Sequence, residues 1–239
     1  MPKPLFEVAG HPIIWHLLTA IARVDVVNEV YLIGYYDESV FRDFIKDAAA
    51  EFRHITIRYL REYQALGTAG GFYHFRDAIL KGRPERLFVL NADVCCAFPL
   101  GDMLRLMTEK DAEAVILGTR VADDVAYNFG CIVSDAHTRR VLHYVEKPES
   151  HISNLINCGV YLFATDAIFP AIRSAIKRRT DRPSSRLLDG TMLDVTATAD
   201  SNASADSPPE VVRLEQDLLA DLADSKQFFV HETRDFWRR

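Results

Sequence analysis

The segment from Arg86 to Val94 constrains the fold more than any other part of the chain. Its residues 87–90 form an uninterrupted apolar run that stops at the polar Asn91. A strand that is apolar on both faces is buried between two helical layers, which is typical of a parallel sheet. In such sheets ligands bind beyond the carboxyl ends of the strands. Asp93 occupies that position, where a carboxylate can hold Mg²⁺ beside a phosphate or simply cap the next turn.

Apolar periodicity predicts that helices and strands alternate along the first half of the chain. Helices are expected at residues 13–22, 38–52, 72–80 and 100–110, and strands at residues 30–34, 55–60, 87–91 and 114–119. This alternation predicts an α/β protein with a mostly parallel central sheet and helices on both faces. We expect the whole chain, residues 1–239, to form one domain.

The pattern changes after residue 121. Strands are expected at residues 130–133, 141–145, 157–163 and 227–231, and helices at residues 165–177 and 214–223. The closely spaced strands predict a mixed or antiparallel extension over the ligand side of the sheet. Residues 178–209 are rich in Ser, Thr, Asp, Ala and Pro and too poor in apolar side chains to pack, so we predict a disordered insertion there.

Composition excludes several classes of protein. The net charge of −6 argues against a bulk nucleic-acid binder, which would carry a basic footprint. No apolar run approaches the length of a membrane span. The four cysteines match no zinc spacing, and we interpret them as reduced thiols of a cytoplasmic protein.

Two short motifs are candidates for binding phosphate. Pro2 and Pro4 hold the backbone extended around Lys3 and so aim its ammonium group, although a solvated lysine is the alternative. Residues 66–71 are mostly small, which lets a ligand approach the backbone, and the helix that follows offers N–H groups. This is not a Walker A loop, and a plain strand-to-helix linker is the alternative.

Two further motifs are candidates for binding hydroxyl groups. Glu146 could accept hydrogen bonds from sugar hydroxyls while Lys147 donates to a phosphate. The alternative is an exposed ion pair, which contributes little. Asn157 and Gly159 interrupt an apolar strand, and a glycine there suggests the close approach of a ligand or of another backbone.

The order of these motifs resembles that of the sugar-1-phosphate nucleotidyltransferases. The motifs, in chain order, are residues 2–5, 66–70, 90–94, 128–130, 145–148 and 156–163. The likeness is greatest to the GDP-mannose pyrophosphorylases, and residues 73–77, 88–95 and 142–148 resemble their alpha subunit in particular. It covers nearly the whole chain apart from residues 178–209.

The resemblance implies a Rossmann-like fold and a chemistry of nucleotidyl transfer. In this family a sugar-1-phosphate oxygen attacks the α-phosphorus of a nucleoside triphosphate, which requires positioning and charge neutralisation. The resemblance implies catalytic roles for Lys3, which would neutralise phosphate oxygens, and for Asp93, which would hold Mg²⁺. By the same likeness, nucleotide binding would involve Gly67, Thr68 and Asn91, and sugar-phosphate binding would involve Asn128, Gly130, Glu146, Lys147, Asn157 and Gly159.

The sequence also departs from the family pattern. The family carries a strand and a glycine-rich, triphosphate-gripping loop before its Pro-Lys-Pro motif, a second metal-binding Asp, and a C-terminal β-helix. Here Arg239 stands where that second carboxylate is expected, and the chain looks truncated at both ends. The absent first strand would lie in the middle of the sheet, so we expect neighbouring strands to have unpaired backbone groups.

These features leave two main hypotheses. The first is a mannose-1-phosphate guanylyltransferase, regulatory or weakly active, that uses GTP and mannose-1-phosphate with Mg²⁺. The second is a non-catalytic GDP-mannose sensor that restrains a catalytic pyrophosphorylase subunit. The absent loop and Arg239 favour the second, and an unproductive fragment without a ligand is the third possibility.

Overall fold

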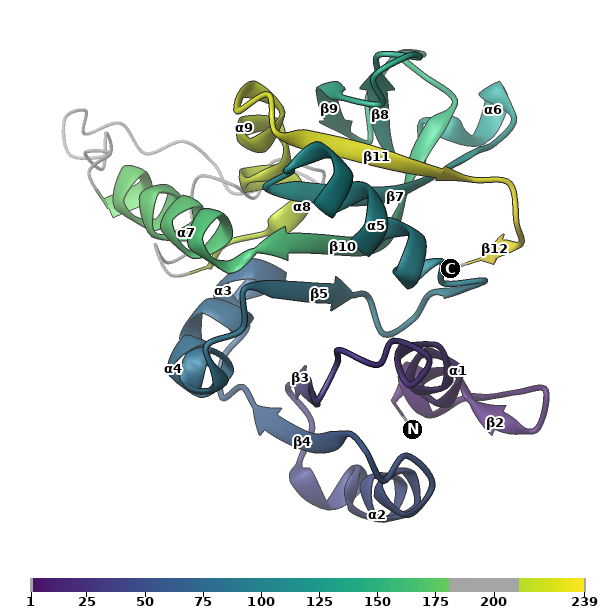
Figure 1. Ribbon diagram of the computed structural model, residues 1–239, viewed down its shortest axis with the longest axis vertical. Coiled ribbons are helices and arrows are strands. Elements are labelled where there is room, and N and C mark those ends of the chain that lie inside the picture. The colour runs from purple at the N-terminus through teal and green to yellow at the C-terminus, as the bar shows by residue number, and fades with distance from the viewer. Residues whose placement is uncertain (1, 181–210, 239) are drawn as a thin grey trace, which may run out of the picture.

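The computed structural model describes residues 2–180 and 211–238 of the chain (Figure 1). The helices are α1 Ile13–Ile21, α2 Arg42–Glu51, α3 Gly67–His74, α4 Arg76–Ile79, α5 Leu100–Lys110, α6 Asp123–Ala126, α7 Thr165–Thr180, α8 Leu214–Asp217 and α9 Leu219–Asp224. The strands are β1 Glu7–Val8, β2 His11–Pro12, β3 Glu29–Gly34, β4 Thr56–Arg61, β5 Arg86–Leu90, β6 Cys95–Cys96, β7 Ala114–Arg120, β8 Gly130–Ser134, β9 Val141–Glu146, β10 Leu155–Ala164, β11 Phe228–Thr233 and β12 Trp237–Arg238.

The main sheet is organised around β10, its longest strand (Figure 1). One edge of β10 pairs with β7 along both halves of the strand, and β11 lies beyond β7. The other edge is shared: Ile156 pairs with β8, whereas residues 160–164 pair with β5. The register with β7 shifts between Asn157 and Tyr161. The β10–β7 ladder is therefore interrupted at the point where β10 exchanges β8 for β5.

The α/β class is confirmed, but the expected parallel pairing of β5 is wrong. Within the described residues, β5 pairs antiparallel with β10, and β7–β11 is the one parallel pair of the main sheet. The error has a simple cause. An apolar run reports burial of both faces of a strand, and burial carries no information about the direction of the neighbouring strand. Here the antiparallel β10 covers the edge of β5.

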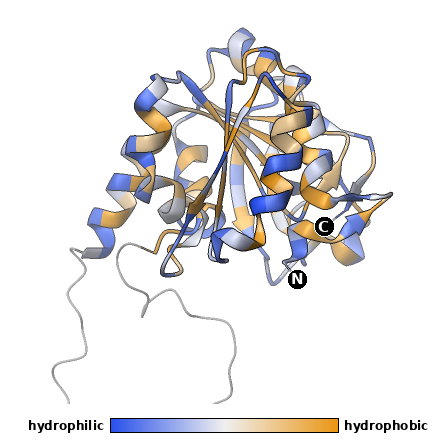
Figure 2. Ribbon diagram, turned by 90° about the horizontal axis from the view of Figure 1, so that it is seen from below, coloured by the Kyte–Doolittle hydropathy of each residue, from blue (hydrophilic) through white to orange (hydrophobic). Residues whose placement is uncertain are grey.

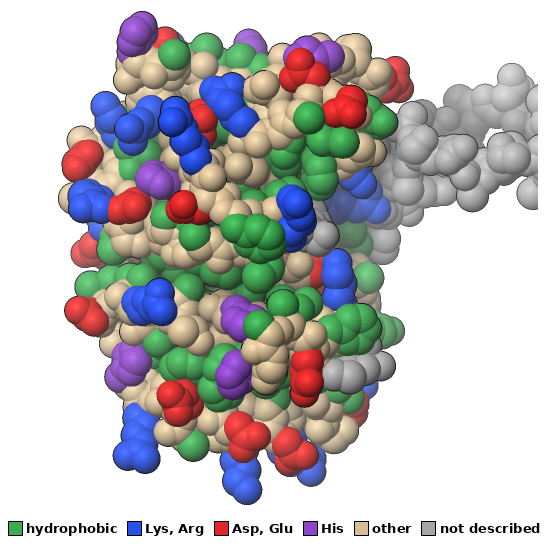
Figure 3. Space-filling view, turned by 90° about the vertical axis from the view of Figure 1, so that its right-hand side faces the viewer, with side chains coloured by type: hydrophobic (Ala, Val, Ile, Leu, Met, Phe, Trp, Pro, Cys, Tyr) green, Lys and Arg blue, Asp and Glu red, His purple; other side chains and the backbone are tan. Residues whose placement is uncertain are grey.

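Strands β3 and β4 form a separate parallel pair (Figure 1). No backbone ladder joins β3 to β5 in the described part of the chain. Even so, alternate residues of the two strands enter the same two core clusters. Val30 and Phe88 contact one cluster, and Ile33 and Val89 contact the other. Figure 3 shows a band of hydrophobic side chains across the middle of the molecule, between the part built on β3–β4 and the part built on the main sheet.

The two clusters cover opposite faces of the sheet because side chains alternate along a strand. Val115 and Leu117 of β7 enter the cluster that contains α5, whereas Ile116 enters the cluster that contains α7, α8 and α9. Figure 2 shows hydrophobic residues gathered along the strands, and hydrophobic and hydrophilic residues alternating along the surrounding helices. None of the helices in the described ranges combines the length and apolarity that a membrane crossing requires.

The predicted helices are largely present, with four differences. The 72–80 helix begins earlier, at Gly67, and is divided into α3, α4 and the 3-10 turn Leu80–Gly82. The 38–52 helix is divided into the 3-10 turn Glu38–Val40 and α2, and the 214–223 helix is divided into α8 and α9. Helix α7 extends to Thr180, so the first three residues of the predicted insertion are helical. Arg179 explains this extension, because its guanidinium binds Asp217 of α8 at 2.5 Å. The remainder of the predicted insertion lies outside the described residues.

Candidate functional site

A pocket of about 510 Å³ lies where the two partners of β10 diverge. Its walls are Lys3, Gly67, Thr68, Asn91, Asn128, Phe129, Gly130, Glu146, Lys147, Asn157, Arg213, Glu215 and Gln216. Nine of the eleven site residues expected from the sequence are among them. The other two adjoin it: Asp93 contacts Lys3, and the carbonyl of Gly159 accepts from the Asn91 N–H at 2.8 Å.

Lys3 and Asp93 form an ion pair, with Nζ 2.7 Å from Oδ2. Pro2 has the extended backbone that its sequence context predicts, but the expectation of an extended backbone around Lys3 itself is wrong. Lys3–Leu5 forms a short 3-10 turn, closed by the Leu5 N–H, which donates to the carbonyl of Pro2 at 3.0 Å. The Lys3 side chain is 54% exposed and that of Asp93 24% exposed. The ammonium group is therefore accessible to an anion while it neutralises the carboxylate.

The donor set around Asp93 allows one mode of metal binding. Mg²⁺ prefers oxygen ligands and is commonly held by one or two carboxylates, water and substrate phosphates. Asp93 supplies one such carboxylate, although Oδ2 also accepts from Lys3. Among the described residues there is no cluster of three His, Cys, Asp or Glu side chains suited to a metal ion. The position of Arg239, expected to replace a second carboxylate, lies outside the described residues.

The glycine-rich turn has a structural role that the sequence did not show. Gly67 has a φ of +74°, and a Cβ there would lie 2.6 Å from the carbonyl oxygen of Val212. That oxygen accepts from the N–H groups of Ala69 and Gly70, at 3.1 and 3.0 Å. The expectation that the first turn of α3 offers its N–H groups to a ligand is therefore wrong for these two amides.

Glu146 ends β9 at the wall of the pocket, and Lys147 follows it directly. Glu146 lies opposite Gly130 of β8, and the N–H of Lys147 donates to the carbonyl of Phe129 at 3.2 Å. Lys147 has a left-handed backbone, with φ of +44°. Such a conformation costs a non-glycine residue about 1–3 kcal/mol and persists where the surrounding structure enforces it. The β8–β9 pairing thus directs this turn into the pocket.

Buried hydroxyl and amide groups form the floor beneath Glu146. Tyr144 donates to Glu146 at 2.5 Å, and Asn157 donates to the hydroxyls of Tyr144 and Tyr161 at 3.1 and 2.8 Å. Burial, with the neighbouring carboxylates, raises the pKa of both tyrosines, which are therefore neutral donors. Gly130 is required beside this group, since a Cβ there would lie 2.0 Å from the Tyr144 hydroxyl oxygen.

Sequence analysis missed Arg213, Glu215 and Gln216, which line the pocket from the start of α8. A helix was expected over residues 214–223, but no motif in the sequence indicated that its polar residues face a pocket. The segment is held in place by backbone contacts: the N–H of Val212 donates to the carbonyl of Leu66 at 2.8 Å.

The comparisons with known proteins agree with this architecture. The family described as "Nucleotidyl transferase" matches residues 1–196. The chain therefore belongs to the nucleotidyl transferase family.

Two curated relatives show where in the family the chain lies. It is 44% identical to the "Probable mannose-1-phosphate guanyltransferase" of Schizosaccharomyces pombe, over 100% of this chain and 55% of the relative. It is 42% identical to the human "Mannose-1-phosphate guanylyltransferase regulatory subunit alpha", over 99% of this chain and 53% of the relative. The chain thus spans about half the length of the curated relatives it matches.

Two solved structures share the fold at low sequence identity. A UDP-glucose pyrophosphorylase complexed with UDP-glucose has a TM-score of 0.71 at 16% identity, with 99% of this chain and 84% of that chain covered. A putative glucose-1-phosphate thymidylyltransferase from Bacillus anthracis, in complex with sucrose, has a TM-score of 0.71 at 17% identity, with 98% and 79% covered.

Proposed function

We propose that the pocket binds a nucleotide sugar of the GDP-mannose type, and that the chain acts in GDP-mannose biosynthesis as an alpha-type, regulatory or weakly active mannose-1-phosphate guanylyltransferase subunit. One observation carries this proposal: the cations of Lys3, Lys147 and Arg213 share one pocket with the carboxylates of Glu146 and Glu215. Cations complement phosphates, and carboxylates accept from hydroxyl groups. A phosphorylated sugar carries both kinds of group.

Each wall of the pocket has a proposed task. Lys3 and Lys147 bind the phosphates, and Asp93 holds Mg²⁺ when the nucleotide brings it. Gly67, Thr68 and Asn91 contact the nucleoside. Asn128, Gly130, Glu146, Asn157 and Gly159 form the sugar subsite. When bound, Mg²⁺ would neutralise phosphate charge, whereas the side chains bind and orient the ligand.

The same pocket supports two hypotheses, which differ in turnover. The relatives' names include a guanyltransferase and a regulatory subunit alpha, so we propose a catalytic pyrophosphorylase subunit as the partner. We also propose that the chain acts in the cytoplasm. The Lys3–Asp93 ion pair favours the sensor hypothesis, because a metal ion at Asp93 competes with an ammonium group already bound there. A nucleotide sugar can bind the cations without that exchange.

A thermal-shift titration tests the binding proposal. A ligand that binds only the folded chain raises its melting temperature. We expect GDP-mannose to stabilise the chain more than GDP, with or without Mg²⁺, and mannose alone to have little effect. Equal melting temperatures with and without GDP-mannose, at millimolar ligand, would contradict the proposal.

Pyrophosphate release distinguishes the two hypotheses. With GTP, mannose-1-phosphate and Mg²⁺, a sensor releases pyrophosphate no faster than its Asp93→Asn variant does. Turnover that Asp93→Asn abolishes would establish the transferase instead.

A further inference from the structure

Two carboxylates of the pocket are joined by a buried chain of hydrogen bonds. Glu146 ends β9 and Glu215 belongs to α8, and both line the pocket. Tyr144 donates to Glu146 at 2.5 Å, and Tyr161 donates to Glu215 at 3.1 Å. Both tyrosine hydroxyls accept from the Asn157 amide, so one side chain connects the two carboxylates.

The direction of every bond in this chain is fixed by the number of available protons. The backbone N–H of Gly159 can only donate, and it lies 2.8 Å from Oδ1 of Asn157. The two protons of the Asn157 amide therefore go to Tyr161 and Tyr144. Each phenol has a single proton, which it gives to its carboxylate. Asn157 therefore orients both tyrosine hydroxyl groups by donating a hydrogen bond to each.

The chain is held rigidly because its middle is buried. Tyr161 is fully buried and Tyr144 is 5% exposed. The glycines on either side leave room for it: a Cβ at Gly130 would meet the Tyr144 hydroxyl, and Gly159 has a φ of +75°. A buried and fully bonded polar network restricts its members to one arrangement. The tyrosines thus fix one oxygen of each carboxylate.

The two carboxylates remain strong acceptors for a ligand. Neither takes part in an ion pair with a described residue, and within the described ranges each accepts its hydrogen bond from a neutral tyrosine. Carboxylates repel phosphate but accept from hydroxyl groups. The ligand group that fits between them is a polyhydroxyl one, and the phosphates belong with Lys3 and Lys147.

We infer that Glu215 is a second hydroxyl-accepting carboxylate of the sugar subsite, an inference that rests on the proposed function. The Asn157 amide positions Glu215 through Tyr161, and the same amide orients Glu146 through Tyr144. Glu215 contacts the sugar, and Tyr161 acts only through Glu215. The role is one of sugar recognition, so it changes affinity for the sugar part of the ligand and leaves affinity for the nucleotide part alone.

The test compares the dissociation constants of GDP and GDP-mannose by calorimetry on the whole chain. The dissociation constant of GDP divided by that of GDP-mannose measures how much affinity the sugar adds. Glu215→Gln should reduce this ratio about 10- to 100-fold, the loss of a hydrogen bond to a charged acceptor. Tyr161→Phe should reduce it about threefold to tenfold, with GDP affinity unchanged in both variants. Tyr161→Phe in the Glu215→Gln background should add nothing, which a merely structural role would not produce.

The chain offers a matched control. Tyr31 donates to Glu29 at 3.0 Å, a tyrosine–carboxylate pair whose members are not among the pocket-lining residues. Glu29→Gln and Tyr31→Phe should leave the ratio unchanged. If Tyr161→Phe does not fold, the nearly isosteric Glu215→Gln decides alone.

The outcomes separate this inference from the proposed function. A wild-type ratio above one that survives Glu215→Gln overturns the inference and leaves the proposed function intact. A wild-type chain that binds neither GDP nor GDP-mannose overturns both.

Discussion

The two ends of the pocket are built by different means. The β10 end, defined by Gly130, Glu146, Asn157 and Glu215, rests on paired strands and buried hydroxyl groups. The loop end, defined by Lys3, Gly67, Thr68 and Asp93, has a half-exposed lysine in an ion pair and helix amides that bond to the protein itself. The β10 end is therefore preorganised, whereas the loop end has side chains that a ligand can reorient. Changes that disturb the buried framework of the β10 end should cost stability, whether or not they also reduce affinity for the sugar. A change of Lys3 at the loop end should cost affinity with little loss of stability.

Gly130→Ala should have the largest effect on stability. Its Cβ would lie 2.0 Å from the Tyr144 oxygen and 2.6 Å from Oε2 of Glu146. We expect the free energy of unfolding to fall by about 3 kcal/mol, because overpacking is added to a broken hydrogen bond. Urea denaturation measures this loss. Gly101→Ala is the control, since nothing lies within 4 Å of its Cβ and alanine favours a helix.

Asp217→Ala tests how α8 is anchored to the β10 end. Asp217 binds the Arg179 guanidinium and accepts from the Arg213 N–H at 2.6 Å. Both side chains of the ion pair are more than four-fifths buried. Removal of one partner from a partly buried pair should lower the free energy of unfolding by about 2 kcal/mol. Asp221→Ala, in a more exposed pair with Arg178, should change it by less than about 0.5 kcal/mol.

Lys3→Met tests the loop end. Lys3 is half-exposed in its ion pair with Asp93, so the free energy of unfolding should change by less than about 1 kcal/mol. The affinity for GDP should nevertheless fall about tenfold, since a charge-assisted hydrogen bond to phosphate is lost. Lys46→Met, on the exposed face of α2, should change neither quantity. A large loss of stability with unchanged GDP affinity would reverse the contrast between the two ends.

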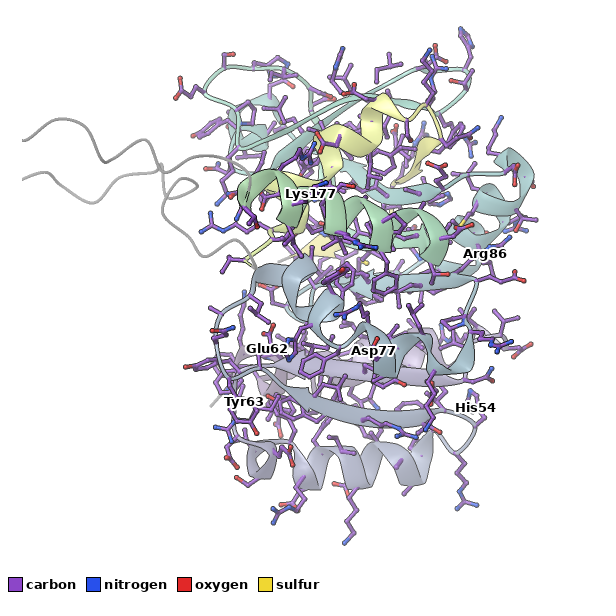
Figure 4. The ribbon with its side chains drawn as sticks, turned by 90° about the vertical axis from the view of Figure 1, so that its left-hand side faces the viewer. His54, Glu62, Tyr63, Asp77, Arg86 and Lys177 are labelled. Carbon is purple, nitrogen blue, oxygen red and sulfur yellow. The ribbon has the colours of Figure 1, made fainter. Side chains whose placement is uncertain are left out.

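Glu62→Gln, at a residue that does not line the pocket, should raise the stability of the chain. Figure 4 shows Glu62 at the end of β4, where its Oε1 is buried and has no hydrogen-bond partner among the described residues. Burial raises the pKa of Glu62, so the neutral acid is favoured more in the folded than in the unfolded chain. The resulting contribution of Glu62 to folding stability is present at pH values below the ordinary carboxyl pKa. It is lost as the pH rises through the raised pKa of the folded state.

At pH 7 the Glu62→Gln variant should therefore be more stable than the wild type by about 1 kcal/mol, a rise in melting temperature of about 2–4 °C. The difference should disappear near pH 4. Glu149→Gln in an exposed loop provides the comparison. An equal gain at pH 4 would show that charge is not the cause.

Much of the local structure could be predicted from the sequence. Helices α1 and α5 and strands β3, β4 and β7 lie within about one or two residues of their expected bounds, because apolar periodicity and turn residues act locally. The candidate site was anticipated through the ordered motifs that contain Lys3, Glu146 and Asn157. Tyr161 was counted only as an apolar strand residue, since its sequence position does not show where its hydroxyl group points.

Local patterns in the sequence were enough to place most of the helices and strands and to show which charges are available. The need for glycine at Gly67 and Gly130 came from contacts with residues distant in the sequence. The tertiary structure alone decided that β5 pairs antiparallel with β10, and that Asn157 reaches Tyr144 while Tyr161 reaches Glu215, 54 residues away. The physical reason is range. Backbone preferences depend on neighbours within one or two turns, whereas a hydrogen bond between distant residues depends on strand register and packing, which form only when the whole sheet assembles.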